Sequence, residues 1–191
     1  MRNPFKFMLL FLAVSISFAS CKDDDDDMTT TKPTPVEPSI YDKLGGTAMV
    51  NDPNNPGTMI EQGKLTLRSV VDSTIFIIAG DSRLQPYFPT LLNEVGSGDL
   101  SGFSALSMSL TNFFSAATGS TTITYGGMNM VDAHDPAKNS RMALKADNAS
   151  MDAFIEDVVA GAGQNGVPAT DPIIGEIGAL LESLRAEIVQ R

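Results

Sequence analysis

The chain has 191 residues, which is enough for one domain with a hydrophobic core. Hydrophobic residues make up 42% of it, the formal net charge is -10, and no basic cluster interrupts the acidic pattern. Such a balance disfavours nucleic acid and anionic membrane surfaces as partners. The single cysteine excludes an internal disulfide framework and any multi-cysteine metal site.

The N-terminus has the pattern of a targeting segment. Arg2 and Lys6 precede an apolar stretch, residues 7–18, that is too short for a usual transmembrane helix. Cys21 follows directly, and the arrangement resembles the signal of a bacterial lipoprotein. We therefore expect residues 1–20 to be a signal peptide and Cys21 to carry the lipid that anchors the protein to a membrane. An ordinary secretory signal with an incidental cysteine is the alternative.

Residues 21–38 are predicted to form a lipid-anchored tether. Five consecutive acids, Asp23 to Asp27, repel one another and cannot pack, and the following stretch is rich in Thr and Pro. Acids just after a lipid-bearing cysteine also resemble the surface-export signal of some Gram-negative lipoproteins. We therefore expect a location in the cell envelope, on the outer membrane, facing the periplasm or the cell exterior.

The remaining chain, residues 39–191, is predicted to be one helical domain. Its apolar residues recur at helical spacing, and no convincing β-hairpin pattern separates them. Asp171 and Pro172 have the pattern of an N-cap followed by a first helical residue. Several helices without strands favour an all-α fold. The apolar stripes are Leu67, Val70, Val71, Ile75 and Ile78; Leu100, Phe103, Leu106, Leu110, Phe113 and Phe114; Met151, Phe154, Ile155, Val158 and Val159; and Ile173 through Ile188.

Few residues of this domain could carry chemistry. His134 is the only histidine, so a hydrolase triad on the usual pattern is excluded, and no phosphate-binding or dinucleotide fingerprint is found. Haem is a different case, because it needs only one axial imidazole inside an apolar helical pocket. The chain has that one imidazole and ample apolar helix.

Five blocks of the domain resemble, in order, the truncated haemoglobins, the two-over-two helical globins of bacteria (here group 1-like). The most specific block is Tyr125, Gly127, Met130 and His134, which matches the family signature Tyr-x-Gly-x-x-Met-x-x-x-His. The other blocks are Ser39 to Gly46; Val70 and Val71 with Asp81, Leu84 and Phe88; Phe113 and Phe114; and Met151 to Pro168.

The resemblance implies a two-over-two globin domain that binds haem iron through His134. It further implies that Phe88 stacks on the porphyrin and that the other matched residues surround it. Those expected neighbours are Ile75, Leu106, Leu110, Tyr125, Met130, Met151, Phe154 and Val158. If no haem is bound, Tyr125 and Met130 are alternatively expected to cap a short helix, and the others are ordinary core residues.

The sequence departs from the family on the distal side. Positions that in the family often hold a Tyr and a Gln are here Ile75 and Leu110, with Leu106 at the gate. The distal pocket is therefore expected to lack hydrogen-bond donors. The chain also looks expanded at residues 51–65, 88–106 and 136–148.

These features predict a haem protein that reversibly binds a diatomic gas, with NO or CO favoured over oxygen storage. It is expected to be a binding protein rather than an enzyme, since repeated turnover needs a reductase partner that this chain does not contain. An exported haem protein could also hold haem in transit. The alternative from another class is a haem-free, globin-like surface interaction or structural module.

Overall fold

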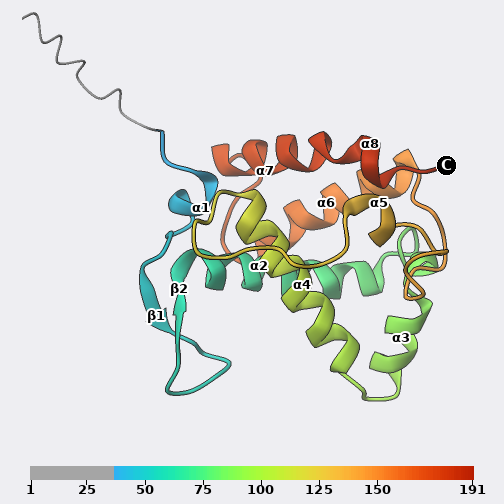
Figure 1. Cartoon of the computed structure of the whole chain (residues 1–191), viewed down its shortest axis with the longest axis horizontal. Coiled ribbons are helices and arrows are strands. Elements are labelled where there is room, and N and C mark those ends of the chain that lie inside the picture. Colours follow the sequence, from blue (N-terminus) through green and yellow to red (C-terminus); the bar gives the residue numbers. More distant parts are fainter. Residues whose placement is uncertain (1–36) are drawn as a thin grey trace, which may run out of the picture. The chain divides into compact units, whose positions relative to one another are not determined.

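A computed structural model describes residues 37–191 of the chain (Figure 1). The predicted signal peptide, Cys21 and nearly all of the tether lie outside the described residues. Within the described part, no helix has the length and apolar character needed to cross a membrane. The helices are α1 Ile40–Lys43, α2 Gln62–Gly80, α3 Pro89–Gly96, α4 Ser101–Ala117, α5 Met130–Ala133, α6 Asn148–Gln164, α7 Pro172–Ser183 and α8 Arg185–Ile188.

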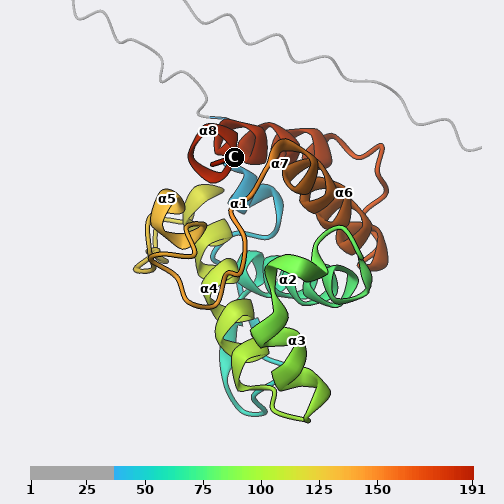
Figure 2. The ribbon, with the colours of Figure 1, turned by 90° about the vertical axis from the view of Figure 1, so that its right-hand side faces the viewer.

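Two pairs of long helices enclose the core. Helix α2 packs against both α4 and α6, and α7 lies along the outer side of α6 (Figures 1 and 2). The apolar stripes predicted from the sequence meet between these helices, which confirms the expected all-α domain. The main buried cluster consists of Tyr41, Leu67, Val71, Ile75, Leu91, Phe114, Ala146, Met151, Val158, Leu181 and Ile188.

The C-terminal helix begins where predicted but ends early. The Asp171 side chain accepts a hydrogen bond from the backbone N–H of Ile173, and Pro172 is the first helical residue. The expected continuous helix to Ile188 is wrong, because the chain leaves the α-helix at Leu184 and resumes as the short α8. Apolar periodicity continues through this break and therefore did not reveal it.

A β-hairpin corrects the expectation of a domain without strands. Strand β1, Met49–Asn51, pairs antiparallel with β2, Met59–Glu61. The turn between them and β2 itself lie in residues 51–65, the segment expected as an insertion. Asp52 at its turn is buried and forms a two-pronged ion pair with Arg68 of α2, with N–O distances of 2.7 and 3.2 Å. Three-residue strands are too short to show an alternating pattern, so this element was invisible in the sequence.

The long connection before α4 is also more ordered than expected. It contains a 3-10 turn, Gln85–Tyr87, and then α3, and α4 begins at Ser101. Leu100, expected on the apolar stripe of α4, precedes the helix as its N-cap and is 55% exposed. The remaining stripe residues of α4 face the core or its margin.

Gly161 lets α6 approach α2 closely, and this makes a testable prediction. A Cβ atom there would clash with the Thr74 hydroxyl and lie 3.0 Å from the Thr74 backbone nitrogen, which cannot swing aside. We expect Gly161→Ala to destabilise the fold by about 1–2 kcal/mol, because overpacking outweighs the usual gain in helix propensity. Urea unfolding measures this.

Gly163 on the same helix is the matched control. Nothing lies within 4 Å of a Cβ placed there. Gly163→Ala is therefore expected to stabilise the protein by roughly 0.5–1 kcal/mol. If both substitutions stabilised it equally, the close approach at Gly161 would not be a constraint.

Candidate functional site

The described residues enclose one large apolar cavity between α2, α4, α5, α6 and the C-terminal helices. Its volume is about 250 Å³, against about 50 and 30 Å³ for two neighbouring cavities. All the residues predicted to surround a haem line it, except Val158. They are Ile75, Phe88, Leu106, Leu110, Tyr125, Met130, His134, Met151 and Phe154.

His134 lies at the C-terminal end of the four-residue helix α5 and is half-buried. Its Nδ1 lies 2.8 Å from the carbonyl oxygen of Met130. A carbonyl can only accept, so Nδ1 carries the proton and Nε2 keeps a free lone pair. Burial lowers the pKa of His134 below its ordinary value, an effect that the Met130 carbonyl partly offsets. The side chain is therefore a neutral imidazole with one nitrogen available to a metal.

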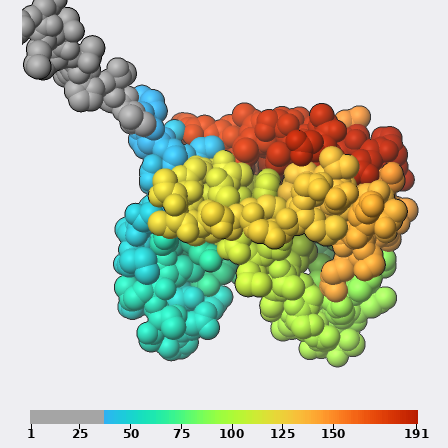
Figure 3. Space-filling view, in the orientation of Figure 1, coloured from blue at the N-terminus to red at the C-terminus, as the bar shows by residue number. Residues whose placement is uncertain are grey.

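The Tyr125-x-Gly127 pair of the signature has a structural explanation. A Cβ atom at Gly127 would lie 2.5 Å from Cζ of the Tyr125 ring, so the ring packs directly on this glycine. The Tyr125 hydroxyl donates to the carbonyl of Met128 at 3.0 Å, and its ring meets Phe113 edge-on at 5.3 Å. These contacts fix the non-helical segment that leads into α5. This segment, yellow in Figure 3, lies across α4.

The wall that was predicted to be distal comes from α2 and α4. Ile75, Leu106 and Leu110 line it as expected, but Ser109 lines it as well. Its hydroxyl has no hydrogen-bond partner among the described residues, so it is a polar group that the predicted pocket omitted. Ser107, in contrast, donates its hydroxyl to Asp72 of α2. Its place outside the cavity lining follows from its position one residue after Leu106 on the helix.

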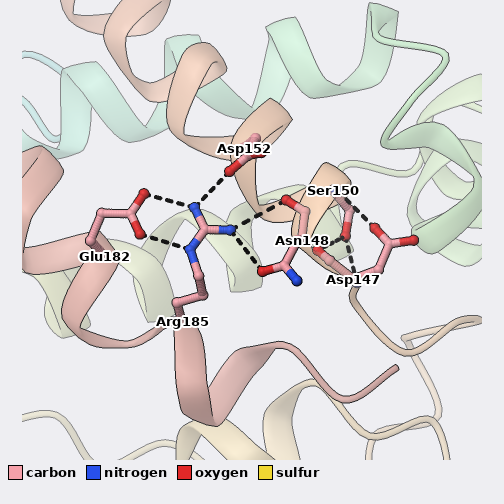
Figure 4. Close-up of polar contacts among 6 residues, drawn as sticks. All are labelled: Asp147, Asn148, Ser150, Asp152, Glu182 and Arg185. Carbon is pink, nitrogen blue, oxygen red and sulfur yellow. Dashed lines mark hydrogen bonds and ion pairs between the residues drawn. The ribbon is translucent and has the colours of Figure 1, made fainter.

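The opposite wall depends on an ion-pair network at the α7–α8 break (Figure 4). The Arg185 guanidinium contacts Glu182 at 2.7 Å and Asp152 of α6 at 2.6 Å, and it also donates to Asn148. At the start of α6, Ser150 and Asp147 form a capping box. The network thus joins the α7–α8 break to the first turns of α6. Cavity-lining residues lie on both sides of it: Ser150 and Met151, and Leu184 and Ile188.

Val158 lies elsewhere. It is buried beside Val70, Val71 and Ala162, where it lines the smaller cavity of about 50 Å³. It continues the stripe of Met151 and Phe154 along α6, but it lies one turn beyond the end of the large cavity. Helical periodicity identifies the face of a helix and does not show where along that face a cavity ends.

Several residues that line the cavity were not predicted from the sequence. Tyr87 is buried, and its hydroxyl accepts a hydrogen bond of 2.8 Å from the C-terminal Arg191. Arg191 also pairs with Asp147 at 2.9 Å. Met142 and Asn139 come from the expanded segment after His134. The closeness of Tyr87 to the C-terminus depends on tertiary contacts and had no local signal.

The lining as a whole fits a haem. It is predominantly apolar and aromatic, and it has one neutral imidazole whose second nitrogen is anchored to a backbone carbonyl. No lysine or arginine belongs to this lining. Among the described residues, no cluster of three or more His, Cys, Asp or Glu side chains could hold a metal ion directly.

This arrangement of helices is the short globin fold, in which two pairs of helices enclose the pocket. Solved structures of a truncated haemoglobin from Tetrahymena pyriformis, in its Fe(III) form and in variants of it, are similar to this chain. Each has a TM-score of 0.56 and 22% sequence identity, and the match covers 81% of this chain and 100% of that one. The expected two-over-two globin fold is thereby confirmed. No family model matches the chain, and no curated protein matches it.

Proposed function

We propose that the large cavity binds haem, that His134 is the axial ligand, and that the bound haem takes up a diatomic gas. The observation that carries this proposal is the neutral His134, anchored through Nδ1, in an apolar cavity of a globin fold. When bound, the haem iron would coordinate the gas. The similar solved structures are of a truncated haemoglobin in its Fe(III) form, and this supports the same proposal.

The residues of the chain have separate parts in this function. Met130 orients His134 through its carbonyl, and Phe88 offers an aromatic face to the porphyrin. The apolar side chains Ile75, Leu106 and Leu110 exclude water from the ligand position. Exclusion of water favours a neutral, weakly polar gas over charged ligands.

Haem titration of the purified full-length protein tests the proposal. We expect saturation at one haem per chain, with a Soret band of the globin type and a shift of that band on addition of CO. A protein that stays colourless at equimolar haem would contradict the proposal, and it would favour the haem-free interaction module instead.

We further propose that Cys21 is lipidated and anchors the domain to the cell envelope, as its position after the apolar N-terminal stretch suggests. Cys21→Ala is expected to yield an unlipidated precursor or a soluble product. Cell fractionation with and without detergent measures this. Unchanged, detergent-dependent membrane association of the variant would refute the anchor.

A further inference from the structure

Helices α2 and α4 carry the distal residues, and one buried polar bond crosses between them. The Ser107 hydroxyl of α4 donates to Oδ1 of Asp72 on α2, over a short distance. Ser107 is only 7% exposed, and Asp72 is half-buried. This bond is the only one that the Asp72 side chain makes among the described residues. The Ser107 hydroxyl and the Asp72 carboxylate therefore depend on each other for a hydrogen-bond partner across the helix crossing.

The bond lies next to the distal wall. Ser107 directly follows Leu106 on α4, and Asp72 precedes Ile75 by three residues on α2. On the same pair of helices, the rings of Phe76 and Phe103 contact each other in a tilted arrangement, with their centroids 4.9 Å apart. Besides the apolar packing between the two helices, one directional polar contact and one aromatic contact therefore join them at this crossing.

A buried hydroxyl does not need an acceptor on another helix to form its hydrogen bond. Ser115 and Thr118 on the same helix donate to carbonyls of their own helix, Thr111 at 2.7 Å and Phe114 at 2.6 Å. Ser107 instead reaches a carboxyl group of another helix. A hydrogen bond between two helices restricts their relative position, whereas one within a helix does not.

We propose that Asp72 and Ser107 are positioning residues that fix the crossing of α2 and α4, and through it the spacing of Ile75 and Leu106 over the ligand position. The consequence for gas binding rests on the proposed haem function. The bond itself does not depend on haem. Without it, the N-terminal half of α4 moves away from α2 more often, and the apolar gate opens more often.

A double-mutant cycle tests this in the full-length protein loaded with haem. We expect Ser107→Ala and Asp72→Ala each to speed CO association about threefold or more, and the double variant to add nothing further. The C–O stretching band should broaden in the same three variants. Ser107→Thr keeps the hydroxyl and should therefore retain the wild-type rate. Ser115→Ala, which removes an equally buried hydroxyl bonded within α4, should leave the rate and the band unchanged.

Several outcomes would overturn the proposal. They are additive effects of Asp72→Ala and Ser107→Ala, an equal effect of Ser115→Ala, or lower stability with unchanged CO kinetics. If the wild type binds no haem, the proposed function fails and the bond is tested by amide hydrogen exchange. Faster exchange of residues 101–110 in both single variants, with no further increase in the double variant, would then support the role of the Asp72–Ser107 bond. Unchanged exchange would refute it.

Discussion

Replacement of His134 with alanine is expected to abolish stoichiometric haem binding. His134 is the only imidazole of the chain and lies in the cavity with Nδ1 already bonded to Met130. Loss of a hydrogen-bond partner of a metal-bound histidine already costs roughly 10- to 100-fold in metal affinity, so loss of the ligand itself should cost at least about 100-fold. Haem titration followed at the Soret band measures the affinity.

The fold itself should change little in this variant. His134 belongs to a four-residue helix and is not part of the main buried clusters, which come from the longer helices. The far-ultraviolet circular dichroism of the haem-free variant should therefore match that of the wild type. His134→Gly with added imidazole is the rescue control, since free imidazole should restore the spectrum. An unchanged spectrum of His134→Ala without imidazole would remove this residue from the axial position.

Acid release of haem should reflect the lowered pKa of His134. Burial lowers this pKa below its ordinary value of 6.5, so the folded protein favours the neutral imidazole. The contribution of this group to stability is present above its unfolded pKa, and it is lost as the pH falls through the folded pKa. Protonation should therefore compete with the iron only below pH 6.5. Release with a midpoint at or above that value would show that another group controls it.

The sequence predicted the helical core better than the elements between the helices. The stripes of α4 and α6 were visible because their apolar residues repeat at helical spacing, and the start of α7 was visible from Asp171 and Pro172. The hairpin at residues 49–61 was not, because three-residue strands show no alternation. The break at Leu184 was hidden because apolar residues continue on both sides of it.

For the site, the residues predicted from the family signature lie together around one cavity, with Val158 as the exception. Two of the lining residues that were not predicted depend on distant parts of the chain for their positions. Tyr87 meets the C-terminal Arg191, and Ser150 lies next to the Arg185 network. No local pattern encodes these contacts, so they become visible only when the chain is folded.

Oxygen release is expected to be fast, and this is the most informative test of the distal wall. Ile75, Leu106 and Leu110 cannot donate a hydrogen bond. A donor to a partly negative ligand in a buried site is worth roughly 1–3 kcal/mol, and about 1.4 kcal/mol changes a rate or equilibrium tenfold. Release should therefore be roughly tenfold to more than a hundredfold faster than with a donor in place, and autoxidation should be rapid. CO, which is much less polar, should bind almost normally.

Two substitutions at Ile75 separate hydrogen bonding from packing. Ile75→Tyr should slow oxygen release, because it places a hydroxyl on the distal wall, whereas Ile75→Phe adds the same ring without the donor and should not. Ser109 lines the cavity with a hydroxyl that has no partner among the described residues, so this hydroxyl could already act as a donor. Stopped-flow measurements on the wild type and on Ser109→Ala decide this. Slow release in the wild type that becomes fast in Ser109→Ala would show that Ser109, and not an apolar wall, controls the ligand.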